Sequence, residues 1–393
     1  MVCSRDGGNL DILLDIDSVM RACSPTEIGS SRENSIWRYL PLLPVADPGN
    51  QGTQLRAVGW TPLLKSRRIA ADLGLENLWF KDDGRNPTAS FKDRASAVVV
   101  ARAREIGADT VVTASTGNAG AALAGMAAAV GVPAVILAPA NAPQAKVAQL
   151  LIYGAQVVLV DGNYDQAFEL SLEAAEEFGW YCRNTGYNAF TAEGKKTAAF
   201  EICEQLSHPE ADRWEAPEAV FVSVGDGNII TGLHKGFKDL FELGWIDHVP
   251  RLYGIQSTGS AAVTHAFESG AEVIQPVQSD TIADSISVDL PRDGLRALRA
   301  VRETDGAMIA VEDGAILEAI RTLGREAVFA EPAGATAYAG LEAAIESDRV
   351  ASDERIVVVI TGSGLKDVPA AMRAAGEATV IEPTLEALRG VMR

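Results

Sequence analysis

The feature that most restricts the fold is a regular alternation of short apolar runs with longer alanine-rich stretches along most of the chain. Several of the apolar runs consist almost entirely of Val, Ile and Leu, which is typical of strands covered on both faces. Strands that alternate with helices form a parallel sheet wrapped by helices. The expected strands are 110–114, 134–137, 156–160, 219–224, 251–255, 308–311 and 355–360, and the expected helices include 118–130, 143–153, 164–177, 228–241, 315–325 and 333–347.

Composition limits the kind of protein that this chain can be. Its 393 residues are 47% hydrophobic and 22% charged, enough to bury one large core or two modest ones. The formal net charge of −19 argues against a nucleic-acid surface, because phosphate backbones are bound by clustered Lys and Arg. No apolar run at the N-terminus has the length of a signal peptide or a membrane span. We therefore expect a cytoplasmic enzyme that contacts neither nucleic acid nor a membrane.

The cysteines and histidines are not spaced like a metal site or a disulfide framework. The four cysteines are far apart, and no pair has the spacing of zinc ligands. The four histidines lack the i, i+4 spacing of ligands on one helix face. We expect reduced thiols and no bound metal; the residues concerned are Cys3, Cys23, Cys182, Cys203, His208, His234, His248 and His265.

A turn followed by an apolar helix places one lysine at the start of that helix. The segment reads Asn86-Pro87-Thr88-Ala89-Ser90-Phe91-Lys92-Asp93-Arg94. A lysine amine that burial keeps partly deprotonated forms a Schiff base with an aldehyde cofactor, and pyridoxal phosphate is the cofactor that most often uses one. Taken alone, the segment also fits a solvated lysine beside an aspartate. The interpretation therefore depends on three further segments.

Each of these segments follows an expected strand. They read Ser115-Thr116-Gly117-Asn118-Ala119, Gly225-Asp226-Gly227-Asn228-Ile229 and Thr361-Gly362-Ser363. A junction of strand and helix offers unpaired backbone N–H groups and the positive end of a helix dipole to an anion. Glycines, which lack a Cβ atom, let several N–H groups converge on one phosphate. The alternatives are ordinary helix capping by Ser, Thr or Asn and tight turns.

Together the four segments resemble the pocket of threonine synthases and their relatives among the fold-type-II, tryptophan synthase β-like, pyridoxal-phosphate enzymes. The lysine segment of threonine synthases usually reads Asn-Pro-Thr-Gly-Ser-Phe-Lys-Asp-Arg, and their last turn reads Thr-Gly-His-Gly-Leu-Lys-Asp. The likeness runs from about residue 35 to residue 370 and includes Gly59-Trp60-Thr61-Pro62-Leu63 and Glu331-Pro332-Ala333-Gly334-Ala335. It implies an α/β fold of two lobes, each with a central, mostly parallel sheet flanked by helices.

The resemblance also implies a role for each residue of the pocket. Lys92 would hold pyridoxal 5'-phosphate and then act as general acid and base. A hydroxyl at Thr361, facing the pyridine nitrogen, would suit eliminations and replacements at the β or γ carbon. The implied cofactor-binding residues are Lys92, Phe91, Asn118, Gly225, Asp226, Gly227, Asn228, Ile229, Thr361 and Ser363. The implied substrate-binding residues are Ser90, Ser115, Thr116, Gly117, Asn118, Ala119 and Thr191.

The pattern and the family together predict how the chain is divided. Residues 1–48 form a lead-in segment, 49–94 and 184–393 form a large pyridoxal-phosphate-binding domain, and 95–183 form a small βαβ domain inserted in it. The lead-in resembles the remnant of a zinc-ribbon segment, but it keeps only one of the cysteines there, so we predict no zinc. The resemblance also implies a homodimer.

The substrate is less clear than the cofactor. Threonine synthases convert O-phosphohomoserine and water to threonine and phosphate, and they hold the substrate phosphate with an Arg in Asn-Pro-Tyr-Arg-x-Glu-Gly-Gln-Lys-Thr. In this chain Thr191 stands in place of that Arg, and Ala89 replaces the glycine of the lysine segment. Lys195 or Arg94 could compensate, or either could be structural.

Two alternatives therefore stay open. One is a diverged β-elimination or β-replacement enzyme that acts on another small amino acid, such as a threonine or serine ammonia-lyase or a cysteate-synthase-like enzyme. The other is a non-catalytic binding protein whose four loops are relics. A second anion site beside the cofactor would favour the threonine synthase reaction.

Overall fold

The fold is built on two separate sheets, seen in a computed structural model that describes residues 2–5, 7–115, 117–140, 142 and 144–392. The larger sheet has the strand order β1-β2-β10-β7-β8-β9, and the smaller has the order β5-β4-β3-β6. Neighbouring strands are parallel except for the β1–β2 pair. The strands are β1 (Leu63–Lys65), β2 (Asn77–Asp82), β3 (Val111–Ala114), β4 (Ala134–Pro139), β5 (Gln156–Val160), β6 (Tyr181–Cys182), β7 (Ala219–Ser223), β8 (Arg251–Ser257), β9 (Ala307–Val311) and β10 (Arg355–Ile360).

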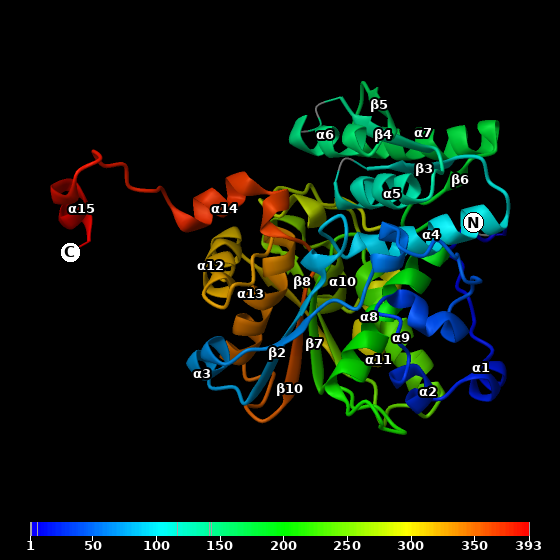
Figure 1. The fold of residues 1–393 in the computed structure, drawn as a ribbon, viewed down its shortest axis with the longest axis horizontal. Helices are drawn as coiled ribbons and strands as arrows, with labels where there is room; N and C mark the ends of the chain where they lie inside the picture. Colours follow the sequence, from blue (N-terminus) through cyan, green and yellow to red (C-terminus); the bar gives the residue numbers. More distant parts are fainter. Residues whose placement is uncertain (1, 6, 116, 141, 143, 393) are drawn as a thin grey trace.

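Helices cover both faces of the larger sheet (Figure 1). The helices α8 (Phe190–Leu206), α9 (Asn228–Glu242) and α11 (Gly294–Glu303) lie on one side, and α12 (Asp313–Gly324) and α13 (Pro332–Glu346) lie on the other. Successive side chains of a strand point to opposite faces, so each strand contributes to two cores. In β10, Val357 and Val359 join the core beneath α8 and α9, whereas their neighbours join the core beneath α13. This is why the strands are apolar at nearly every position.

The smaller lobe repeats this arrangement on a shorter sheet. The helices α4 (Lys92–Glu105) and α5 (Asn118–Ala129) pack on one face, and α7 (Tyr164–Phe178) packs on the other. All four of its strands lie between residues 111 and 182. The expected fold class, two lobes with mostly parallel sheets, is therefore confirmed. The exact domain boundaries stay predictions.

The remaining helices are short and lie around these layers. They are α1 (Ile16–Ala22), α2 (Pro25–Gly29), α3 (Arg68–Leu73), α6 (Gln144–Ile152), α10 (Ala262–Glu268), α14 (Val368–Ala375) and α15 (Leu385–Val391). Figure 1 shows α15 on an arm that extends away from the body of the molecule. In the described part of the chain, no helix is both long enough and apolar enough to cross a membrane. The four cysteines are free thiols.

Candidate active site

A cavity with a polar lining opens at the carboxyl ends of the parallel strands, where ligands bind in open α/β sheets. It measures about 310 Å³, and its wall includes residues at the carboxyl ends of β3, β4 and β6. A smaller cavity of about 50 Å³ adjoins it at the ends of β7 and β10. Lys92 and Asp226 line both cavities. Three of the four segments singled out in the sequence thus meet at one place, and Thr361 brings the fourth.

Lys92 begins α4 with its side chain at the junction of the two cavities. Burial lowers the pKa of Lys92, and the nearby Arg183 acts in the same direction, whereas Glu331 and Asp226 oppose the shift. A lowered pKa leaves more of the amine in the unprotonated form that attacks an aldehyde. The lysine therefore has the properties that a Schiff-base partner needs.

The turn before Lys92 is held against the turn after β10. Ser90 and Gly362 form an antiparallel bridge, and the Phe91 N–H donates to the Thr361 carbonyl at 2.8 Å. The Ser90 hydroxyl is buried, and it has no hydrogen-bond partner among the described residues. A buried hydroxyl without a partner is costly, although Ser90 lines neither of the two cavities.

The loop before α9 has the form of a phosphate cradle. Gly227 has φ +93°, and a Cβ atom there would lie 2.7 Å from the Asp293 carbonyl oxygen, so only glycine fits without strain. The N–H groups that follow it are the first of α9, and these have no partner within the helix. The loop residues from Gly225 to Ile229 all line the smaller cavity. The loop therefore has the geometry that a bound phosphate group requires.

One ionisable residue, Lys195, adjoins the cradle, and another, Asp226, lies within it. Lys195 donates to the Asn228 side-chain oxygen at 2.6 Å, and the Asn228 amide donates to Asp293 at 2.7 Å. Burial lowers the pKa of Lys195 well below its ordinary value, and Lys92 adds to the shift. Asp226 carries the opposite charge; burial raises its pKa, and its carboxylate accepts the Arg292 N–H at 3.3 Å. Asp226 therefore meets a backbone donor outside the cradle.

The amide of Asn118 faces Glu331 across the cavity. It donates to the Glu331 carboxylate at 2.8 Å and to the Ser285 hydroxyl at 3.4 Å. Glu331 precedes α13 and is buried, and burial raises its pKa. Asn118 and Glu331 thus bring the smaller lobe and the larger lobe together beside Lys92.

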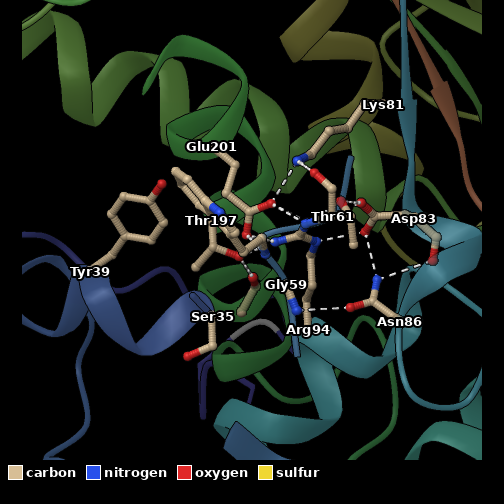
Figure 2. A network of polar contacts seen from close by, with 12 residues as sticks. Ser35, Tyr39, Gly59, Thr61, Lys81, Asp83, Asn86, Arg94, Thr197 and Glu201 are labelled. Carbon is tan, nitrogen blue, oxygen red and sulfur yellow. Dashed lines mark hydrogen bonds and ion pairs between the residues drawn. The ribbon is translucent and has the colours of Figure 1, made fainter. Parts of the chain in front are cut away.

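A buried charge network anchors the lysine helix from behind (Figure 2). Arg94 binds the Asp83 carboxylate with two nitrogens, at 2.6 and 2.9 Å, and the Glu201 carboxylate at 2.6 and 2.8 Å. Lys81 also binds Glu201, at 2.7 Å. All four side chains are fully buried. Arg94 is therefore structural, and it connects α4 to β2 and to α8.

The same network fixes the turn that carries the lysine segment. Asn86 accepts the Gly59 N–H at 2.9 Å and donates to Asp83 at 3.1 Å, as Figure 2 shows. Gly59 has φ +83°, and a Cβ atom there would lie 2.6 Å from Glu201. The Gly59-Trp60-Thr61 and Asn86-Pro87-Thr88 segments are therefore parts of a single support.

The predicted site residues fall into three groups. Lys92, Ser115, Gly117, Asn118, Ala119, the residues 225–229 and Thr361 line the two cavities. Ser90, Phe91, Thr191 and Ser363 are not among the lining residues; Thr191 is buried and donates to the Asn188 carbonyl at 2.7 Å, and Ser363 caps the turn Gly364–Lys366. Thr116 lies outside the described residues. The roles themselves stay predictions.

Among the residues of the cavity wall that sequence reasoning missed are Arg183, Thr185 and Glu331. Arg183 comes directly after β6, a strand of two residues that carries no clear periodic signal. Had β6 been recognised, its carboxyl end would have pointed to Arg183 and Thr185, as the end of β3 pointed to Ser115. Glu331 belongs to a family landmark, but the sequence did not indicate its position in the pocket.

The chain was compared with known families and proteins. Residues 55–362, more than three quarters of the chain, match the family described as pyridoxal-phosphate dependent enzyme. The chain belongs to this family. The threonine synthase of Methanocaldococcus jannaschii is 39% identical over 390 residues, which is 98% of this chain and 94% of that protein. The threonine synthase of Synechocystis sp. is 37% identical over 359 residues, 90% of this chain and 89% of that protein. The chain is accordingly a threonine synthase-like, pyridoxal-phosphate-dependent lyase.

Solved structures agree on the fold of this family. The processed form of threonine deaminase isoform 2 from Solanum lycopersicum has a TM-score of 0.70 at 24% identity, covering 94% of this chain and 91% of that one. Maize serine racemase has a TM-score of 0.66 at 27% identity, covering 77% of this chain and 88% of that one. Several chemistries on amino acids are thus known on this fold, so the fold alone does not determine the reaction.

Proposed function

We propose that this lyase converts O-phosphohomoserine and water to L-threonine and phosphate. The observation that carries the proposal is the likeness to threonine synthases over nearly the whole length of the chain. The site supports it with Lys92 between a phosphate cradle and a second, larger cavity. Thr361 directly follows β10 and lines the smaller cavity, where it provides an uncharged hydroxyl group.

Each part of the site has a task in this proposal. The cradle at 225–229, with Lys195, holds the cofactor phosphate, and Lys92 holds the cofactor aldehyde. The Ser115–Ala119 loop at the start of α5 binds the amino-acid carboxylate, because helix-start N–H groups favour an anion. When bound, the cofactor withdraws electrons from the α carbon of the amino acid. The turn before Lys92 and the turn after β10 meet behind the pocket and support it. They contribute Ser90, Phe91 and Ser363.

Lys92 is the residue that moves protons. Its lowered pKa suits a group that accepts a proton at one carbon and returns it at another near neutral pH. In the proposed reaction Lys92 Nζ carries protons among the α, β and γ carbons. The phosphate departs from Cγ, and a water molecule then adds its oxygen at Cβ and gives up one proton.

We also propose that the enzyme is a cytoplasmic homodimer. The free thiols support a reducing compartment, since three of the four cysteines are buried and none is paired. The family resemblance supports the dimer. Light scattering of the purified protein tests it, and a monomer mass at micromolar concentration would contradict it.

The first experiment is an absorption spectrum of the purified protein, followed by a turnover assay. We expect the visible absorption band of lysine-bound pyridoxal phosphate, and equal amounts of threonine and phosphate from O-phosphohomoserine. The Lys92→Ala variant should lose both the band and turnover. Lys366→Ala is the matched control, because burial also lowers the pKa of this nearby lysine, and it should keep the band.

Other results would redirect or reject the proposal. A cofactor band without threonine formation, together with 2-oxobutyrate from L-threonine or pyruvate from L-serine, would assign the chain to the ammonia-lyases. A band in Lys92→Ala equal to that of the unmodified protein would show that another residue holds the cofactor.

A further inference from the structure

Arg183 is a buried cation with an unused donor beside Lys92. Its side chain follows β6 and lines the larger cavity, and the residue is only 1% exposed. One terminal nitrogen donates to the Thr185 hydroxyl at 2.9 Å, and Nε contacts the Ser96 hydroxyl at 3.4 Å. The other terminal nitrogen is buried without a partner among the described residues.

This arrangement is expensive unless an anion completes it. A buried guanidinium is normally paired with a carboxylate, yet none of the ion pairs found among the described residues includes Arg183. Burial lowers the pKa of Arg183 to about 10, so the side chain is still charged at neutral pH. Asp226 acts on Arg183 through space, but it is not paired with it. The protein therefore maintains a desolvated positive charge that faces a cavity.

The position of Arg183 selects among the anions that the site would hold. The cofactor phosphate belongs to the cradle of the smaller cavity, and Arg183 does not line that cavity. The proposed place for the amino-acid carboxylate is the start of α5, at Gly117, Asn118 and Ala119. The remaining anion is the phosphoryl group at the far end of the substrate side chain. Thr185, which lines both cavities, bonds to Arg183 and is placed to contribute a hydroxyl.

We propose that Arg183, supported by Thr185, binds the substrate phosphoryl group and thereby selects a phosphorylated amino acid. The inference rests on the proposed function, because it names the residue that recognises O-phosphohomoserine. Thr191 does not provide this contact, because its hydroxyl is used by the Asn188 carbonyl and its side chain is fully buried. A bidentate guanidinium is also the side chain best suited to a phosphate.

The test compares holoenzyme variants for binding of three probes. Arg183→Met removes the charge at similar length, and Arg183→Lys keeps the charge without the planar fork. Arg321→Met is the matched control, because it removes an arginine that lines neither cavity. The probes are O-phosphohomoserine, inorganic phosphate and L-threonine, which carries the amino-acid groups without a phosphate. Dissociation constants come from the change in cofactor absorbance, and protection by inorganic phosphate comes from the unfolding temperature.

We expect Arg183→Met to weaken O-phosphohomoserine and inorganic phosphate by about 10- to 150-fold, the equivalent of one charge-assisted contact of roughly 1.5–3 kcal/mol. Affinity for L-threonine should stay within a factor of about three of the unmodified enzyme, a difference of less than about 0.7 kcal/mol. The affinity of Arg183→Lys should fall between that of Arg183→Met and that of the unmodified enzyme, and Arg321→Met should match the unmodified enzyme. Without phosphate, Arg183→Met should unfold at the same or a higher temperature, because an unpaired buried charge has been removed.

Two results would overturn the inference. One is an equal loss of affinity for L-threonine, which would assign Arg183 to the carboxylate. The other is an unfolding temperature that inorganic phosphate raises equally in the enzyme and in Arg183→Met. Failure of the proposed function gives a different result: no threonine forms, but phosphate still protects the enzyme and not Arg183→Met. In that case the anion subsite stands and the substrate is another phosphorylated amino acid.

Discussion

At the scale of single residues, substitution of Lys195 directly tests how the cofactor phosphate is bound. Its amine lies 2.6 Å from Asn228 in the wall of the phosphate cradle, at the position where the family segment carries Gln. A dianion in the cradle would be stabilised by this charge, so Lys195→Gln should weaken cofactor binding by about 10- to 100-fold. Titration of the apoenzyme with pyridoxal phosphate measures this.

The comparison for Lys195→Gln is Lys366→Gln, which removes a charge from a neighbouring cavity and not from the cradle. That variant should bind the cofactor as the unmodified protein does. An unchanged dissociation constant in Lys195→Gln would mean that the backbone N–H groups hold the phosphate unaided, and the lysine would then serve only to orient Asn228.

Ala89 is a second residue with a definite cost. Its φ of +64° lies in the left-handed region, where a Cβ atom costs about 1–2 kcal/mol. Ala89→Gly removes this strain. Glycine also makes the unfolded chain more flexible, which lowers stability by about 0.4–1 kcal/mol. We therefore expect a net gain of about 0.5–1 kcal/mol in the free energy of unfolding. Urea denaturation measures it. Ala101→Gly, within α4, should instead lose about 1 kcal/mol, and a loss in both variants would rule out strain at Ala89.

At the scale of elements, the network of Arg94 ties α4, β2 and α8 into one unit. Glu201→Gln keeps the shape of the side chain but leaves Arg94 and Lys81 with too little negative charge in a buried place. Removal of one partner from a buried charge pair costs about 3–5 kcal/mol, and we expect a loss of that size in the free energy of unfolding. Glu318→Gln removes an exposed partner of Arg321 and should cost less than about 1 kcal/mol.

The pH dependence of the free energy of unfolding gives a second test of the same network. Burial alone would raise the pKa of Glu201, but Arg94 and Lys81 outweigh it and hold the pKa at about 2, below the ordinary 4.5. Between these values the unfolded chain binds a proton that the folded chain does not. Stability from Glu201 is therefore complete above pH 4.5 and is lost as the pH falls toward 2. Glu201→Gln should show a flatter dependence in this range, and equal slopes would contradict the assignment.

These elements also show what the sequence could and could not predict. The bounds of β5 and β10 were predicted to the residue, because each is a short run rich in Val, Ile and Leu that is visible locally, although β10 is buried and β5 is largely exposed. The strand β2 was missed because it ends in Lys81 and Asp82, and charged side chains usually indicate an exposed segment. Lys81 is buried only because Glu201, 120 residues later, pairs with it. The four site segments were found from their loop chemistry, whereas Arg183 depended on a strand too short to recognise.

At the scale of the whole molecule, polar contacts join the two lobes around the cavity. Lys366, after β10, donates to Gln149 of α6 at 2.9 Å, and Arg292 pairs with Asp165 of α7 at 2.6 Å. Lys146 of α6 pairs with Asp284 of the larger lobe. Such contacts are individually weak and water can replace them, whereas the apolar cores lie within the lobes. The cavity therefore lies at the part of the molecule that is easiest to rearrange.

The C-terminal arm is the segment whose removal should matter least to folding. From Gly376 to Met392 no side chain is buried, and α15 has only seven residues, too few for a stable isolated helix. A chain that ends at Ala375 should therefore keep its unfolding temperature to within about 2 °C and should keep its cofactor band. Removal of α14 as well should lower the temperature, because Ala370 and Ala374 are buried and α14 packs against α12. A large drop in unfolding temperature after the first truncation would mean that the arm binds a surface outside its own subunit. The mass of the truncated protein by light scattering would then decide whether that surface belongs to the second copy of the proposed dimer.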